Sequence, residues 1–209
     1  PMSRALTEDV RTWTDEELIA EYLRTRDRQL FALLVRRHQD PVYGMCVRIL
    51  GSPSQAEEVA QEVFIAVFKN LDRFRGDSKF KTWLYRVVVN HCKNRQAYRG
   101  RRKEKQHESF EQERELDGGG TVTRQLESPN PGPEQAVLAK ERREVLERGL
   151  AQLGEAHRTI IVMRDLQGMA YEEIADALEV QPGTVKSRLH RARVELKNLV
   201  GKMLISLEG

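Results

Sequence analysis

The chain has 209 residues, and its 35 lysines and arginines against 32 aspartates and glutamates give a net charge of only +3. Hydrophobic residues make up 39% of the chain and charged residues 32%, which fits two small hydrophobic cores better than one deep core. Two cysteines, Cys46 and Cys92, are too few for a disulfide scaffold or a four-cysteine zinc site. No apolar run approaches the roughly 20 residues needed to span a bilayer, and the polar start predicts no secretory signal. We therefore expect a cytoplasmic protein with reduced thiols.

The first half of the chain predicts only helices, because its apolar residues recur with helical spacing and no stretch alternates convincingly as a strand would. The predicted helices cover residues 15–26, 29–50, 54–71 and 82–98. The third has one clean apolar face, formed by Ala56, Val59, Ala60, Val63, Phe64, Val67, Phe68 and Leu71. Ser54, followed three residues later by Glu57, predicts a capping box at its start.

An acidic linker is predicted over residues 104–133. From residue 104 to residue 134 the chain has eight acidic and three basic residues, a net charge of −5. Three consecutive glycines at 118–120 make its middle flexible, and a proline-rich end stiffens it. Two interpretations stay open: a solvated spacer, or an acidic strand that occupies a nucleic-acid channel.

A second helical domain is predicted from residue 134 onward. One apolar stripe consists of Val137, Leu138, Val145, Leu146, Leu150 and Leu153, and the next helix, with Ile160, Ile161 and Leu166, is closed by Gly168. We therefore predict an all-α protein with an N-terminal tail, two helical domains, a linker between them and a C-terminal tail. The respective ranges are 1–13, 14–103, 104–133, 134–201 and 202–209.

The end of the second domain predicts a helix-turn-helix. Residues 172–178 form a short helix, residues 179–183 a turn with Pro182 and Gly183, and Thr184 could cap the helix that follows. Ala175 is small where two helices must cross closely, and Val185 fills the wedge between them. The buried stripe of the second helix is Val185, Leu189, Ala192 and Leu196.

The opposite face of this second helix is basic, with Lys186, Ser187, His190, Arg191 and Arg193, and with Arg188 at its side. Such side chains can read base edges in the major groove. A solvated surface helix is the alternative interpretation. A basic helix that follows a turn of this spacing favours DNA binding.

Residues 73–103 contain eleven basic residues and one acidic residue, Asp77. Five aromatic residues are interleaved: Phe74, Phe80, Trp83, Tyr85 and Tyr98. Basic side chains that bind phosphates, together with aromatic rings that stack on unpaired nucleobases, are typical of a surface that binds single-stranded nucleic acid. Alternatively, Phe74, Phe80 and Trp83 could belong to the core. The segment 74–80 predicts a tight loop at Gly76 that could grip a flipped base.

Four stretches together resemble the extracytoplasmic-function (ECF) sigma factors, especially the envelope-stress branch. They are residues 56–64 (AEEVAQEVF), 74–90 (FRGDSKFKTWLYRVVVN), 171–175 (YEEIA) and 183–193 (GTVKSRLHRAR). The resemblance implies a region 2 bundle (σ2) that binds core RNA polymerase and melts the −10 element, and a region 4 helix-turn-helix (σ4) that reads the −35 element. It implies as partners the polymerase β′ clamp helices and β flap, promoter DNA, and an anti-sigma factor that holds the protein inactive and could sequester it at the inner membrane.

The resemblance also assigns residues to these roles. Polymerase binding maps to Glu57, Glu58, Gln61 and Glu62, whose carboxylates would face basic clamp helices. Contact with the −10 element is expected from Phe74, Gly76, Asp77, Ser78, Lys79, Trp83, Tyr85, Arg86 and Asn90. Contact with the −35 element is expected from Lys186, Ser187, Arg188, His190 and Arg191. We expect a stress- or signal-responsive set of promoters, and no cofactor.

Two other classes of protein fit less well. A DNA-binding regulator without polymerase contact would need a receiver or ligand domain, and the alternating strands of a receiver are missing. A nuclease would need carboxylates converging on a metal, and the histidines, at 38, 91, 107, 157 and 190, lack ligand spacing. We therefore expect neither enzymatic activity nor a metal site.

Overall fold

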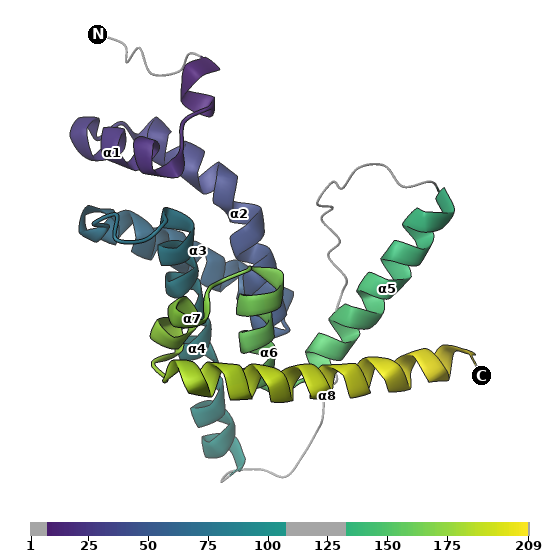
Figure 1. The fold of residues 1–209 in the computed structure, drawn as a ribbon. Helices are drawn as coiled ribbons and strands as arrows, with labels where there is room; N and C mark the ends of the chain where they lie inside the picture. Colours follow the sequence, from purple (N-terminus) through teal and green to yellow (C-terminus); the bar gives the residue numbers. More distant parts are fainter. Residues whose placement is uncertain (1–7, 108–132, 209) are drawn as a thin grey trace. The chain divides into compact units, whose positions relative to one another are not determined.

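The computed structural model describes residues 8–107 and 133–208, and within these ranges the regular structure is helical (Figure 1). The described residues form two compact units, one made of residues 8–46 and 54–102 and the other of residues 47–53, 103–107 and 133–208. Among the described helices, none has the length and apolar character that crossing a membrane requires.

The first unit begins earlier than the sequence predicts. A 3-10 helix, η1, spans Glu8–Arg11, and Val10 is buried. Part of the predicted N-terminal tail is therefore packed structure. Helix α1 spans Asp15–Thr25 and starts with a capping box in which Thr14 and Glu17 satisfy each other's backbone N–H groups.

The next two helices, α2 (Arg28–Leu50) and α3 (Pro53–Asn70), agree with the predicted ranges to within one residue. Gly51 lies between them with a φ of +70°, which favours glycine. The predicted capping box at Ser54 is wrong, because α3 begins at Pro53 and Ser54 lies inside its first turn. The buried face of α3 consists of Ala56, Val59, Ala60, Val63 and Val67.

Helix α4 (Phe80–His107) is longer at both ends than the predicted 82–98. It follows the short 3-10 helix η2 (Leu71–Arg73) and the loop 74–79. It packs on α2, where Cys46 and Cys92 are both buried and the hydrogen bond between their thiols, with burial, raises the pKa of Cys92. Because α4 continues through His107, the first four residues of the predicted linker are helical. The rest of that prediction, residues 108–132, lies outside the described residues.

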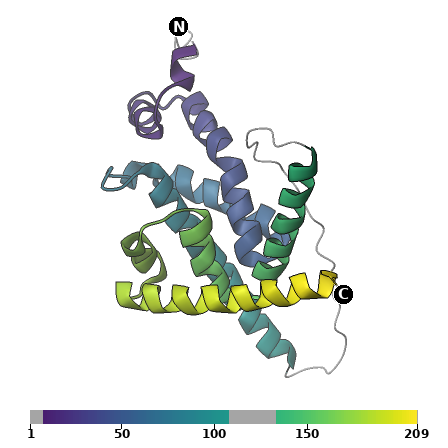
Figure 2. The same ribbon diagram turned by 45° about the vertical axis from the view of Figure 1, so that its right-hand side comes forward.

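The second unit is organised around α8 (Pro182–Glu208), which packs against α5 (Pro133–Gln152), α6 (Glu155–Ile161) and α7 (Tyr171–Leu178). Helices α6 and α7 lie along the N-terminal half of α8, as the turned view shows (Figure 2). Helix α5 crosses α8 closely at Gly149. A Cβ there would come within 2.9 Å of Val200 and 3.1 Å of Leu196.

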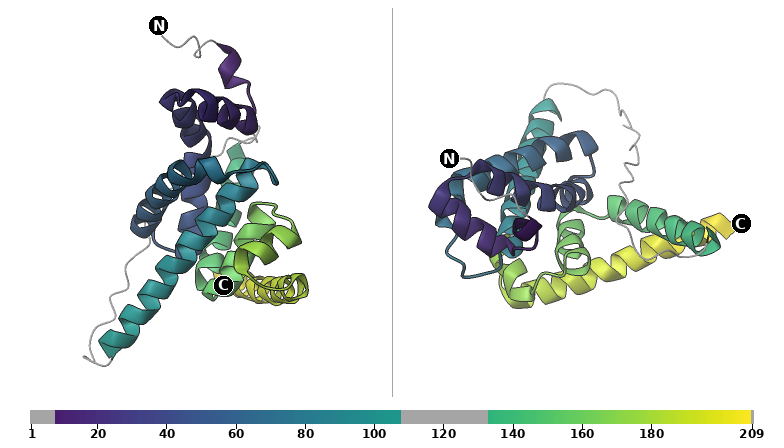
Figure 3. Two further views of the ribbon diagram at one scale, coloured as in Figure 1. Left: turned by 90° about the vertical axis from the view of Figure 1, so that its left-hand side faces the viewer. Right: turned by 90° about the horizontal axis from the view of Figure 1, so that it is seen from above.

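Two boundaries in this unit correct the sequence predictions. The helix predicted to end at Gly168 is interrupted, because α6 gives way to the π-helical turn η3 (Val162–Leu166) before Gly168 takes a φ of +71°. Helix α8 begins at Pro182, so Thr184 lies within it and does not cap it. The helix continues through Glu208, and residues 202–208 of the predicted C-terminal tail are therefore helical (Figure 3).

Candidate nucleic-acid interface

The loop 74–79 stands between η2 and α4 and presents its polar groups to solvent. Arg75, Gly76, Asp77 and Lys79 are exposed, and Phe74 and Ser78 are half-buried. Gly76 has a φ of +77°, and nothing lies within 4 Å of the place where a Cβ would stand. Backbone conformation, and not lack of space, therefore favours glycine at the tip of this loop.

An aromatic cluster ties the loop to α4. Phe74 packs edge-on against Phe80, with ring centroids 5.8 Å apart, and lies 5.7 Å from the ring of Trp83. Phe80 is fully buried, whereas Phe74 and Trp83 stay half-buried. Phe80 is therefore a core residue, and the rings of Phe74 and Trp83 combine core contacts with an open side.

Tyr85 corrects the predicted set of DNA contacts. Its side chain is 2% exposed and belongs to the core of the unit, and burial raises the pKa of its hydroxyl. The prediction that Tyr85 offers its ring to DNA is therefore wrong for this conformation. Tyr98, farther along α4, is the exposed tyrosine of this helix at 58%.

A hollow of about 340 Å³ lies between α3 and α4 beside this cluster. Its lining is Ala66, Asn70, Arg73, Trp83, Val87, Asn90 and His91. Asn90 was predicted to lie in a base pocket, and Arg73, Asn70 and His91 were not assigned to one. Trp83, Val87 and Asn90 share one face of α4 at helical spacing, and Arg86 beside them is half-buried and engaged within the protein.

The residues predicted to bind polymerase share the exposed face of α3. Glu57, Glu58, Gln61 and Glu62 are all exposed, but two of them already have a partner. Arg95 of α4 donates hydrogen bonds of 2.6 Å to Glu58 and 2.7 Å to Glu62, and these carboxylates raise the pKa of Arg95.

Apolar side chains extend this acidic face. Ile65 is 54% exposed and Phe68 is 45% exposed, although Phe68 also packs against Tyr22 and Phe31. The sequence stripe placed Phe68 in the core and left Ile65 unassigned. The spacing of Ile65, four residues after Gln61, was the signal that could have placed it on this face.

The helix-turn-helix is formed by α7 and α8, and its core follows the sequence prediction. Ile174, Ala175 and Val185 are buried between the two helices. Helix α7 ends at Leu178 and is followed by Glu179, which takes a left-handed conformation with φ +57°. The N–H of Val180 donates to the carbonyl of Ala175.

The exposed face of α8 carries most of the predicted −35 contacts. Lys186, Ser187, His190 and Arg191 are exposed, and Arg188 is half-buried. Arg193 differs from them, because its guanidinium binds the two carboxylate oxygens of Asp165. That pair raises the pKa of Arg193 and makes its side chain less available to DNA than the sequence pattern suggested.

Sequence reasoning missed a cluster of cations around Tyr171. The Arg164 guanidinium lies 4.7 Å from the centre of this ring and the Lys186 ammonium 5.9 Å. Arg164 also donates a hydrogen bond of 2.7 Å to the carbonyl of Met169. Two cations held at one ring form a site of positive potential that suits a phosphate. Across the described ranges, no three His, Cys, Asp or Glu residues are grouped to hold a metal ion.

Comparisons with known proteins match both units. The model of Sigma-70 region 2 matches residues 34–103, and the model of Sigma-70, region 4 matches residues 143–196. The chain is 35% identical over 193 residues to RNA polymerase sigma-H factor of Pseudomonas aeruginosa, covering 92% of this chain and 97% of the relative. It is 36% identical over 189 residues to ECF RNA polymerase sigma-E factor of Escherichia coli strain K12, covering 90% and 96%.

Two solved structures have a similar fold. The sigma factor RpoE of Bartonella quintana, in complex with the anti-sigma factor NepR, covers 82% of this chain and 96% of its own, with a TM-score of 0.62 and 19% identity. CnrH, in complex with the cytosolic domain of CnrY, covers 90% and 97%, with a TM-score of 0.56 and 25% identity. With both regions present, in order, over nearly the whole length of close relatives, this chain belongs to the ECF sigma factors, which initiate transcription with RNA polymerase.

Proposed function

We propose that this sigma factor captures an unpaired base of the −10 element in the hollow between α3 and α4. One observation carries the proposal: the half-buried ring of Trp83 and the amide of Asn90 line the same hollow, beside the exposed loop 74–79. A flipped base needs a stacking face and polar groups for its edge. Trp83 supplies the face, and the Asn90 amide supplies both a donor and an acceptor. Arg73 adds a cation at the rim, where the sugar-phosphate backbone would pass.

Asn90→Ala tests this role. The variant should bind core polymerase normally and form open complexes roughly tenfold less well, because the lost polar contact specifies the base. The measurement is permanganate reactivity of the −10 region on a promoter that the wild-type holoenzyme opens. Asn94→Ala is the matched control, since Asn94 is exposed one turn farther along α4 and outside the lining of the hollow. Loss of polymerase binding in Asn90→Ala, or equal loss of opening in both variants, would refute the pocket assignment.

We further propose that the exposed face of α3 binds the clamp helices of the polymerase β′ subunit and that the second unit engages the β flap. Support comes from the combination of four polar residues with the exposed side chain of Ile65. Carboxylates steer the encounter with a basic surface, whereas burial of Ile65 supplies affinity. Basic groups of the clamp helices would compete with Arg95 for Glu58 and Glu62.

Ile65→Ala tests this face. Loss of a buried apolar contact should weaken binding to core polymerase roughly tenfold, measured by fluorescence anisotropy of the labelled chain. Ser54→Ala, an exposed change at the start of the same helix, should leave binding unchanged. Equal affinity of wild type and Ile65→Ala would place the polymerase contact elsewhere.

For the −35 element, we propose that Ser187, His190 and Arg191 read base edges in the major groove, with Arg188 at the margin. Lys186 and Arg164, held at Tyr171, contact phosphates and set the register of α8 on the duplex. This division follows from what surrounds each side chain: Arg191 is exposed on α8, whereas the Lys186 ammonium lies over the ring of Tyr171 that Arg164 also contacts.

We also propose that an anti-sigma factor controls this protein and that its promoters respond to a stress or signal. The support is the family, together with two related folds solved in complex with NepR and with the cytosolic domain of CnrY. An inhibitor that covers the face of α3 would block polymerase directly. Such a partner should compete with core polymerase for the wild-type chain and should bind Ile65→Ala less well.

A further inference from the structure

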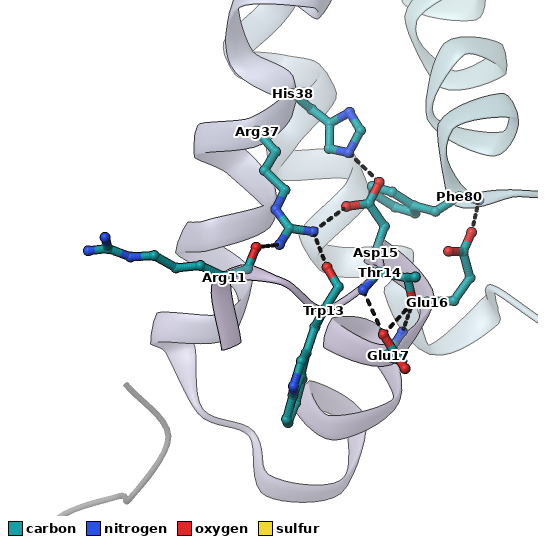
Figure 4. A network of polar contacts seen from close by, with 9 residues as sticks. All are labelled: Arg11, Trp13, Thr14, Asp15, Glu16, Glu17, Arg37, His38 and Phe80. Carbon is teal, nitrogen blue, oxygen red and sulfur yellow. Dashed lines mark hydrogen bonds and ion pairs between the residues drawn. The ribbon is translucent and has the colours of Figure 1, made fainter. Parts of the chain in front are cut away.

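The first turn of α1 holds two neighbouring carboxylates that reach two different helices. Asp15 accepts hydrogen bonds from Arg37 at 3.0 Å and from His38 at 2.7 Å, both on α2. Glu16 accepts a hydrogen bond of 2.8 Å from the backbone N–H of Phe80, the first residue of α4. Figure 4 shows the two side chains diverging from the same turn. Helix α1 therefore connects α2 to the residue that directly follows the loop 74–79.

The contact made by Glu16 supplies what the start of α4 lacks. Residue 79 stands immediately before this helix, and its carbonyl accepts from the N–H groups of Thr82 and Trp83. Its own side chain is a lysine, which has no acceptor for the first free N–H groups of the helix. The carboxylate of Glu16, 64 residues away in the sequence, takes the place of a local N-cap. Its negative charge also suits the positive end of the helix dipole.

Asp15 supports the ring of Phe80 indirectly, through His38. The His38 ring, which Asp15 holds, meets the Phe80 ring edge-on, with centroids 5.4 Å apart. The Phe80 ring in turn touches Phe74 of the loop and Trp83 of the hollow. Arg37 anchors the turn before α1 as well, since it donates to the carbonyls of Trp13 and Arg11.

We propose that Glu16 is a positioning residue for promoter opening: it holds the start of α4, and so the loop 74–79 and Trp83, in the geometry that accepts an unpaired base. This inference rests on the proposed role of that loop in base capture. Helix α1 precedes residues 34–103, the range that matches region 2. The base-binding surface then depends on three helices, because α1 supports the loop and the start of α4 in addition to the contributions of α3 and α4.

Three variants of the full-length chain test the proposal. Glu16→Ala removes the acceptor, and Glu16→Gln keeps an oxygen that can accept from the same N–H. Glu17→Ala is the matched control: it removes a neighbouring carboxylate that caps only α1 through Thr14. Both alanine variants should lower thermal stability slightly, and only Glu16→Ala should disturb the loop.

The first measurement is limited trypsin cleavage of the free chain after Arg75 and Lys79, two exposed basic residues in the loop. Glu16→Ala should be cut about three- to tenfold faster, in line with the net contribution of one ordinary hydrogen bond. Glu16→Gln and Glu17→Ala should stay within about twofold of wild type. Unchanged cleavage in Glu16→Ala, or the same increase in Glu17→Ala, would overturn the inference.

The second measurement is open-complex formation by holoenzyme made with each variant, on a promoter that the wild type opens. Glu16→Ala should open it about three- to tenfold less well at unchanged affinity for core polymerase, with rescue by Glu16→Gln. Faster cleavage of the loop without any loss of opening would overturn the role of the loop in base capture, and with it this inference. If wild type and Asn90→Ala also open DNA equally, the failure lies in the proposed function and not in the contact between Glu16 and Phe80.

Discussion

The two surfaces that we propose to face DNA in this sigma factor are built in different ways. On α8, Lys186, Ser187, His190 and Arg191 project from one regular helix, and the backbone period of that helix sets their spacing. In the first unit, the loop 74–79 and the hollow beside it depend on contacts from η2, α3, α4 and α1. Substitution of one exposed residue of α8 should therefore remove one DNA contact. Substitution of a residue behind the loop should change the conformation of the loop and of the hollow.

This difference sets what each surface can do. A rigid helix with fixed projections suits double-stranded DNA, whose groove has a regular form. A loop held over a partly open aromatic cluster suits a single base that has left the duplex, because the base must enter a preformed hollow. We therefore expect substitutions on the exposed face of α8 to change DNA recognition without changing folding stability. Substitutions around the start of α4 should change both.

The largest expected effect is on the core behind the hollow. Tyr85→Ala should lower the free energy of unfolding by about 3–5 kcal/mol, as for other large buried aromatic residues. Tyr98→Ala, on the same helix with a 58% exposed side chain, should cost less than about 1 kcal/mol. Chemical denaturation monitored by circular dichroism measures both. If Tyr85→Ala is stable but impairs DNA melting, the ring is a DNA contact after all.

Arg191→Ala should separate recognition from stability on α8. If Arg191 reads a base edge, its loss should cost roughly 1–3 kcal/mol at one position of the −35 element and nothing in unfolding. Binding to a set of single-base promoter variants measures this. Arg193→Ala is the control, because Arg193 is tied to Asp165. An equal loss on every promoter variant would make Arg191 a phosphate contact.

Lys186→Ala and Arg164→Ala should give a smaller effect of another kind. Each should weaken −35 DNA binding by a similar factor for all sequences and reduce the slope of log K against log salt by about 1. Titrations at several salt concentrations measure the slope. An unchanged slope with altered base preference would move Lys186 to the base-reading group.

The smallest expected effect is a pH dependence at Asp15. Hydrogen bonding from His38 in the first place, and also Arg37, lowers the pKa of Asp15 from its ordinary value of 3.8. A depressed folded-state pKa contributes stability that is present above 3.8 and is lost as the pH falls below it. The difference in unfolding free energy between wild type and Asp15→Asn should therefore shrink below that pH. A difference in unfolding free energy that stays constant as the pH is lowered would contradict this prediction. Asp77→Asn, in the exposed loop, is the control.

The same contrast explains how far the sequence could predict the molecule. Helical periodicity located every long helix and the exposed face of α8, because each depends on residues close together in the chain. It could not show that Tyr85 is buried or that Asp165 holds Arg193, because a neighbouring element decides each. The cap on α4 is the clearest case, since nothing near Phe80 in the sequence indicates Glu16. The ends predicted at residues 13 and 201 differ from the structure, because η1 packs before the first and α8 continues beyond the second.

The most direct test of the account is transcription by core RNA polymerase, with and without this protein, on a genomic promoter library. New start sites should share −35 and −10 elements, and Asn90→Ala should use them roughly tenfold less well while its binding to core polymerase persists. Start sites without shared elements, or no start sites together with no binding to core polymerase, would contradict it.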